Sequence, residues 1–104
     1  MKFKKLVRDK IPDMIIKEGY VPKTRVLSDK EYLRELDKKL SEEVREYRQS
    51  KELEELADIL EVIYAISKAR GYTVDDLMKV KNEKQEKRGG FSEKIFLISK
   101  SKKK

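Results

Sequence analysis

The chain has 104 residues, 38% hydrophobic and 45% charged, which is enough for one small domain with a modest core. It contains no Cys and no His, so thiol nucleophiles, disulfides, histidine bases and zinc sites of the usual kind are excluded. The net charge of +7 is concentrated at the end, where four lysines follow Ser99 and leave 23 basic against 20 acidic residues elsewhere, a balance of +3.

Helix-capping residues punctuate the chain and predict four helices. Ser28 and Glu31 form a capping box, and glycines follow the other helices. The predicted helices are Pro12 to Lys17 or Glu18, Asp29 to Tyr47 or Arg48, Lys51 to Arg70 with Ser50 as its cap, and Val74 to Arg88.

The last part of the chain is predicted to differ from the helices. Phe91 to Ile98 contains four consecutive apolar residues, which favours a strand or an extended arm that packs on the helices. The expected fold is a small all-α bundle with a short extended C-terminal segment, completed by dimerisation because one chain has a modest core. Residues 1–98 form the predicted domain and residues 99–104 a basic disordered tail.

The location is predicted from what the sequence lacks. No apolar run approaches the roughly 20 residues that span a bilayer, and the start MKFKKLVRDKIP lacks the hydrophobic region of a signal peptide. We therefore expect a cytoplasmic protein with no membrane contact.

Acidic residues interrupt the apolar stripe of the helix from Asp29. On a helical wheel of about 100° per residue, Glu43 falls inside the stripe and Glu46 on its border, whereas Glu42 falls well outside. The stripe itself consists of Leu33, Leu36, Leu40, Val44 and Tyr47.

The next helix repeats this arrangement. Its apolar face is broad; Glu55 projects within it beside Val62, and Asp58 lies at its edge. Two consecutive antiparallel helices are therefore predicted to direct four acids into one space: Glu43, Glu46, Glu55 and Asp58.

Four neighbouring carboxylates repel one another and must protonate, reach water or bind a cation. These two helical segments carry no matching cluster of Lys or Arg, so a divalent cation is the simplest explanation. Oxygen-only ligands favour Mg²⁺, with Mn²⁺ as the alternative. Either acid cluster alone is typical of a solvated helix face, but two that face inward on consecutive helices favour a site.

The helix from Val74 changes character along its length. Its apolar first turn leads on the same face to Lys81, Lys84 and Arg88, and Arg88 opens the sequence RGGF. The same residues are also typical of a solvent-exposed, charged helix that ends at the Gly89–Gly90 pair. Beside a metal cluster, they favour a polyphosphate bound between the metal and the basic side chains.

The order of motifs carries a family resemblance. KLVRDKIP, EEVRE, EELAD and KRGGF together resemble the all-α nucleoside triphosphate pyrophosphohydrolases, the MazG-like group, and within it a small phosphoribosyl-ATP pyrophosphohydrolase-like branch. The likeness runs from Lys5 to about Leu97. Eight residues, Tyr47 to Glu54, separate the two acid pairs, fewer than is usual in the group.

The resemblance implies hydrolysis of a nucleotide between its α and β phosphates, giving a monophosphate and pyrophosphate, in a role such as clearing non-standard nucleotides. A glutamate, either Glu43 or Glu46, would accept the proton of the attacking water. The implied Mg²⁺ ligands are Glu43, Glu46, Glu55 and Asp58, and the implied phosphate contacts are Lys81, Lys84 and Arg88, joined on grounds of charge by Arg8 and Lys10.

Two other functions compete with this interpretation. A nucleic-acid-binding helical domain would explain the basic arm, the tail and the isoelectric point near 9.5, but not the inward acids. A non-catalytic dimerising relative would use the broad apolar face only as a subunit interface. The predicted partners are a nucleotide and further copies of the chain, in a homodimer or a higher homo-oligomer, and not nucleic acid.

Overall fold

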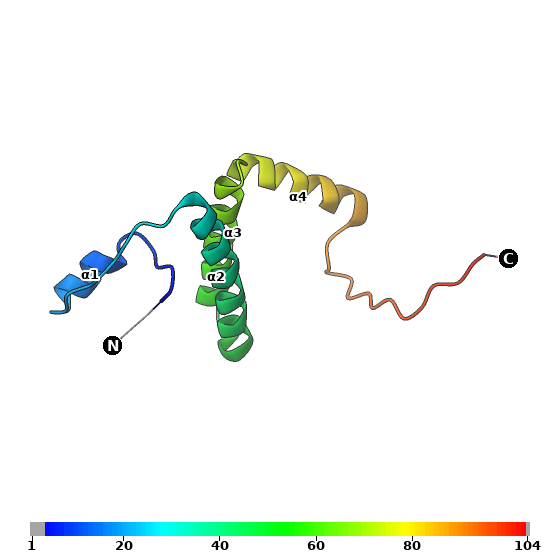
Figure 1. The fold of residues 1–104 in the computed structure, drawn as a ribbon. Helices are drawn as coiled ribbons and strands as arrows, with labels where there is room; N and C mark the ends of the chain where they lie inside the picture. The colour runs from blue at the N-terminus through cyan, green and yellow to red at the C-terminus, as the bar shows by residue number, and fades with distance from the viewer. Residues whose placement is uncertain (1–3, 104) are drawn as a thin grey trace. The chain divides into compact units, whose positions relative to one another are not determined.

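The computed structural model describes residues 4–103, and these residues form α-helices and no strand. The predicted all-α fold class is therefore confirmed, while dimerisation stays a prediction. In order, the helices are α1 (Ile11–Lys17), α2 (Asp29–Ser50), α3 (Leu53–Ala69) and α4 (Val74–Arg88) (Figure 1).

The chain separates into two compact units, one that ends at Val74 and one that begins at Asp75. This division lies within the single domain expected from the sequence. No helix in the part of the chain that the structure describes is long and apolar enough to cross a membrane.

The capping box fixes the start of α2 as predicted. The Ser28 hydroxyl accepts a hydrogen bond from the Glu31 N–H at 3.2 Å, and the Glu31 carboxylate accepts one from the Ser28 N–H at 3.2 Å. Arg25 Nη2 donates to the same carboxylate at 2.8 Å, and this hydrogen bond is the largest cause that lowers the pKa of Glu31 to about 2. Two backbone donors that a bare helix end would leave unpaired are thus satisfied.

Helices α2 and α3 pack side by side as a hairpin (Figure 1). Only Lys51 and Glu52 connect them, and Lys51 takes the left-handed conformation (φ 60°), from which its N–H donates to the Tyr47 carbonyl at 2.8 Å. The predicted role of Ser50 as the cap of α3 is wrong. Because the chain reverses at Lys51, α2 continues through Ser50, and the cap position of α3 is Glu52.

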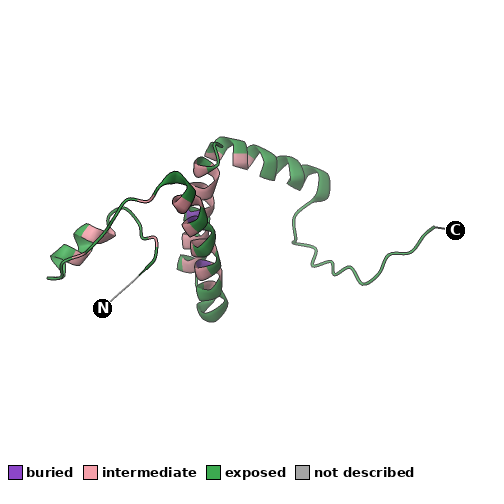
Figure 2. Cartoon of the chain, in the orientation of Figure 1, coloured by how far each residue is buried: buried purple, intermediate pink, exposed green. Residues whose placement is uncertain are grey.

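The hairpin has a very small core. Among the described residues, the buried apolar side chains are Leu36 of α2 and Val62 of α3 (Figure 2). Leu53, Leu56 and Leu60 of α3 remain 80%, 45% and 43% exposed. A single copy of this unit therefore leaves uncovered much of the apolar surface that the sequence assigns to α3.

The unit that begins at Asp75 contains most of α4 and the segment after it. Gly89, with a φ of 80°, follows the last residue of α4, as the Gly-Gly pair predicts. Residues 95–98 form no strand and are 77–89% exposed, so the strand alternative is wrong, since no described segment pairs with them. They run on as an irregular segment (Figure 1). Of the predicted tail, Lys104 lies outside the described residues.

Candidate metal centre

The short connection between α2 and α3 brings the two acid pairs to the same level of the hairpin. At 1.5 Å per residue, Glu43 lies about 10 Å before the end of α2. Glu55 and Asp58 lie about 3 and 8 Å after the start of α3. The eight-residue spacing therefore serves to align the acids across the hairpin.

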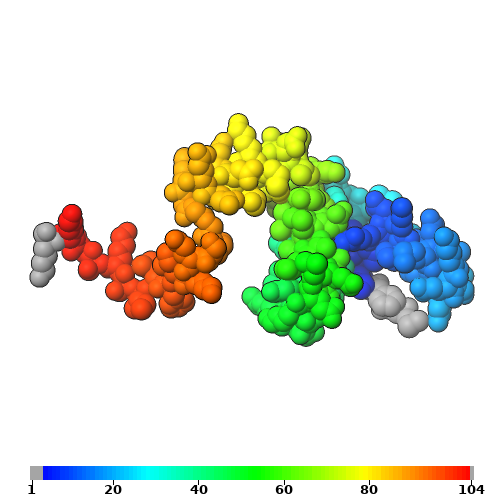
Figure 3. Space-filling view, turned by 180° about the vertical axis from the view of Figure 1, so that it is seen from behind, coloured from blue at the N-terminus to red at the C-terminus, as the bar shows by residue number. Residues whose placement is uncertain are grey.

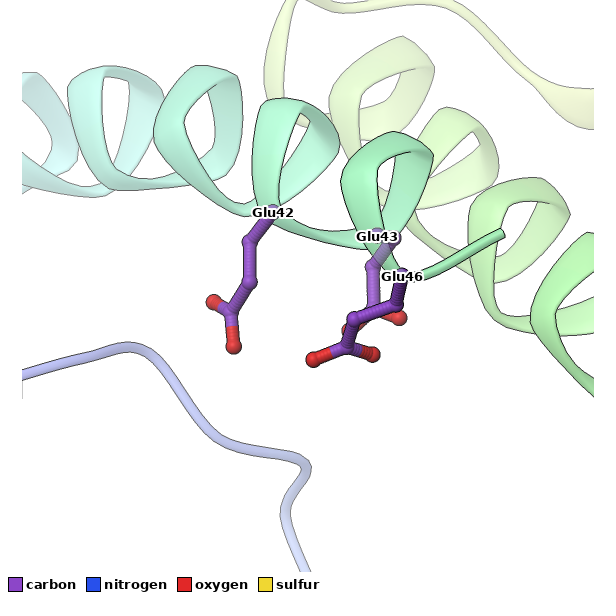
Figure 4. Close-up of side chains that lie close together, drawn as sticks. All are labelled: Glu42, Glu43 and Glu46. Carbon is purple, nitrogen blue, oxygen red and sulfur yellow. The ribbon is translucent and has the colours of Figure 1, made fainter. Parts of the chain in front are cut away.

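The acids form two overlapping groups with Glu43 in common. Carboxylate oxygens of Glu43, Glu55 and Asp58, from both helices, lie within 4.8 Å of one another. Oxygens of Glu42, Glu43 and Glu46 do the same along α2, and their side chains leave one side of the helix toward the N-terminal segment (Figure 4). Glu42, placed outside the apolar stripe by the helical wheel, therefore joins the cluster.

Glu43 is the most enclosed of these acids. It is 6% exposed, as its position in the apolar stripe predicts, because it follows the buried Leu36 by two helical turns. Removal from water raises the pKa of the Glu43 carboxyl; the hydrogen bond from Lys39 opposes that shift, and the charge of Glu46 adds to it. The Glu43 carboxyl thus lies where water does little to stabilise its charged form.

Two buried oxygens of the cluster lack partners. Glu43 Oε2 and Glu55 Oε2 accept no hydrogen bond from any residue that the structure describes. Buried polar atoms are nearly always hydrogen-bonded, and exceptions call for a ligand, a strain or a functional reason. Acidic clusters are common on helices, but enclosed oxygens without a donor are not, and they distinguish this cluster from a solvated face.

Individual cations pair with acids of the cluster, although α2 and α3 carry no matching cluster of Lys or Arg. Lys39 Nζ lies 3.3 Å from Glu43 Oε1 and 3.4 Å from Glu42 Oε2, and Arg8 Nη2 lies 2.8 Å from Asp58 Oδ1. The Lys39–Glu43 pair is an i,i+4 pair that the sequence reasoning missed, although its spacing was readable. None of these contacts reaches the two unpartnered oxygens within the described residues.

The donor set fits a hard divalent cation. Mg²⁺ binds oxygen ligands at about 2.0–2.1 Å, so two ligands on opposite sides of it are about 4 Å apart. Oxygens within 4.8 Å of one another need only a small rotation of flexible side chains to reach that spacing. Glu43, Glu55 and Asp58 would hold such an ion, with Glu46 next to Glu43.

The remaining predicted site residues lie elsewhere. Lys81, Lys84 and Arg88 are exposed on α4, in the unit that begins at Asp75, and Lys81 Nζ donates to Gln85 Oε1 at 3.2 Å. Lys10 is exposed at the start of α1. Their assignment as phosphate contacts stays a prediction.

Similarity to known proteins covers part of the chain. Over 43 residues, or 41% of its length, the chain is 56% identical to an uncharacterized protein from Mycolicibacterium smegmatis, and the match spans 44% of that protein. No protein-family model and no solved structure matches the chain.

The raised pKa of Glu43 predicts a distinct pH dependence of stability in the absence of metal. Its contribution is fully present below the ordinary value of 4.5 and is lost as the pH rises through the higher folded-state pKa. In EDTA, we expect Glu43→Gln to flatten the decline in unfolding free energy above pH 4.5 and to be about 1 kcal/mol more stable than the natural chain near pH 7.5. Urea unfolding measured across that pH range provides the test.

Glu35→Gln is the matched control, because Glu35 lies on the same helix and pairs with Lys38 at 3.2 Å. This variant should keep the slope of the natural chain. Equal slopes for the natural chain and Glu43→Gln would show that Glu43 is not held as a buried charge.

Proposed function

We propose that the chain is a Mg²⁺-dependent nucleotide pyrophosphohydrolase that cleaves a nucleoside triphosphate, or a related nucleotide, between its α and β phosphates. The observation that carries this proposal is the group formed by Glu43, Glu55 and Asp58 from two helices, with a buried oxygen on each glutamate that accepts no hydrogen bond from residues 4–103. The order of motifs from KLVRDKIP to KRGGF supports the same reaction by resemblance.

The acids divide the chemical work between holding the ion and moving a proton. When bound, Mg²⁺ polarises phosphate oxygens and lowers the pKa of water. Glu43, Glu55 and Asp58 are the proposed ligands. Glu46 shares the α2 group with Glu43 but is not in the two-helix group, so its carboxylate is the better candidate to accept the proton of the attacking water.

Cations near the acids complete the proposed site. Arg8 and Lys5 approach the cluster from the N-terminal segment, and a guanidinium is well suited to bind phosphate oxygens with two donors. The proposed task of these two side chains is to offset charge on the phosphate chain and on the departing pyrophosphate. The substrate would thus lie between carboxylates that hold the metal and cations that hold the phosphates.

A nucleotide panel tests the reaction. With Mg²⁺, we expect the purified protein to release pyrophosphate, and not orthophosphate, from at least one nucleoside triphosphate, including non-standard ones. Asp58→Asn should lower that activity by at least 100-fold and abolish the rise in melting temperature caused by Mg²⁺, because one ligand is lost.

Asp37→Asn is the matched control, since Asp37 is an exposed acid of α2 outside the cluster, and it should retain both properties. Release of no pyrophosphate from any nucleotide in the panel would refute the proposal.

We also propose that two or more copies associate through the apolar face of α3. The supporting observation is the exposure of Leu53, Leu56 and Leu60 beside a core of very few buried side chains. A surface of this kind on a small domain usually marks an interface.

Light scattering measures this association directly. The natural chain should have at least twice the 12.4 kDa mass of one copy, and Leu53→Glu should weaken the assembly at least tenfold, because it places a charge on the apolar face. Leu97→Glu changes an equally exposed leucine outside α3 and should have no effect. A natural chain that remains a monomer at a concentration of about 100 μM would contradict the proposed interface.

A further inference from the structure

The N-terminal arm, defined here as residues 4–10, already carries two cations to the acid cluster. Arg8 Nη2 lies 2.8 Å from Asp58 Oδ1, and Lys5 Nζ lies 3.8 Å from Glu42 Oε1. Arg8 and Asp58 are 50 positions apart in the sequence, so this contact is tertiary and places the arm against α3. In the space-filling view the N-terminal segment, in blue, lies directly against α3, in green (Figure 3).

The arm neutralises only the outer edge of the cluster. Arg8 and Asp58 have side-chain exposures of 58% and 39%, so their ion pair is accessible to water. The enclosed oxygens Glu43 Oε2 and Glu55 Oε2 receive no hydrogen bond from the arm or from any other described residue. A compact ion could reach these oxygens, whereas a planar guanidinium at the outer edge does not.

We propose that Arg8 and a divalent cation alternate at Asp58, so that the arm holds the metal-free cluster and is released when the metal binds. This inference depends on the proposed metal centre. A doubly charged ion coordinated by Asp58 would lie within a few ångströms of the guanidinium and repel it. A water-exposed ion pair offers little to resist that repulsion.

Release would give Arg8 a second task. A guanidinium freed from Asp58 regains the donors with which it can bind a phosphate oxygen, so metal loading would prepare the site for a phosphorylated ligand. Arg8 would then contact the ligand directly. Its exchange couples the state of the arm to the state of the metal centre.

The affinity of the cluster for metal shows whether Arg8 competes with the ion or helps to hold it. If Arg8 competes with the metal, Arg8→Ala should bind Mn²⁺ about three- to tenfold more tightly than the natural chain in isothermal titration calorimetry. Arg8→Lys keeps the charge but loses the planar guanidinium, and its Mn²⁺ affinity should lie between those of the natural chain and Arg8→Ala. Lys17→Ala removes a positive charge from exposed α1 and should leave the affinity unchanged.

The position of the arm gives a readout that does not depend on activity. Because the chain contains no cysteine, spin labels can be placed specifically at Lys4→Cys on the arm and Gln49→Cys on α2. Adding Mg²⁺ should shift or broaden the distance distribution between the labels. In the Arg8→Ala background, the metal-free protein should already show the distribution of the metal-loaded natural chain.

The outcomes separate this inference from the proposed function. Equal or weaker Mn²⁺ binding by Arg8→Ala, or an arm that does not move with Mg²⁺, overturns the exchange and leaves the metal centre in place. Failure of the natural chain and of every variant to bind Mn²⁺ overturns both the exchange and the metal centre. Tighter binding with release of the arm, but with no pyrophosphate released from any nucleotide, supports the exchange and refutes only the proposed hydrolysis.

Discussion

Three carboxylates, those of Glu43, Glu55 and Asp58, lie close together across the α2–α3 hairpin. Their mutual repulsion must be offset if the two helices are to remain packed. Two like charges 4 Å apart repel by about 4 kcal/mol at an effective dielectric constant of 20. The exposed ion pair between Arg8 and Asp58 stabilises the fold by only about 0.2–1 kcal/mol. Lys39 reaches Glu43 Oε1 but not Oε2. The described cations therefore offset this repulsion only in part, and a doubly charged ion is the simplest way to complete the neutralisation.

The hairpin gives up stability to keep this arrangement. An apolar residue at position 43 would extend the stripe that contains Leu36 and would avoid the cost of a buried charge. Natural sequences retain such costs mainly where function requires them. The two-residue connection has a matching role, because Lys51 reverses the chain at the point that places acids of α2 and α3 at one level.

Local sequence patterns predicted the parts of this structure that depend on local physics. The Ser28 capping box fixed the start of α2, and helical periodicity placed Glu43 in the interior. The helical wheel did not predict that Glu42 joins the cluster, because a wheel gives only the direction in which a residue leaves the helix and not how far its long side chain can reach. The contact between Arg8 and Asp58 was beyond prediction, because the arm has no periodic pattern and the partners are 50 positions apart in the sequence. The boundary between the two compact units lies within the first turn of α4, so no linker in the sequence marks it.

Anomalous scattering from crystals grown with Mn²⁺ is the sharpest test of the proposed metal centre, because it locates the ion without reference to activity. The account predicts one strong peak at roughly 2.2 Å from carboxylate oxygens of Glu43, Glu55 and Asp58, with the Arg8 guanidinium moved away from Asp58. A cluster without any peak at millimolar Mn²⁺, with Arg8 still on Asp58, would contradict it. The acids would then be a strained feature of the hairpin and not a metal centre.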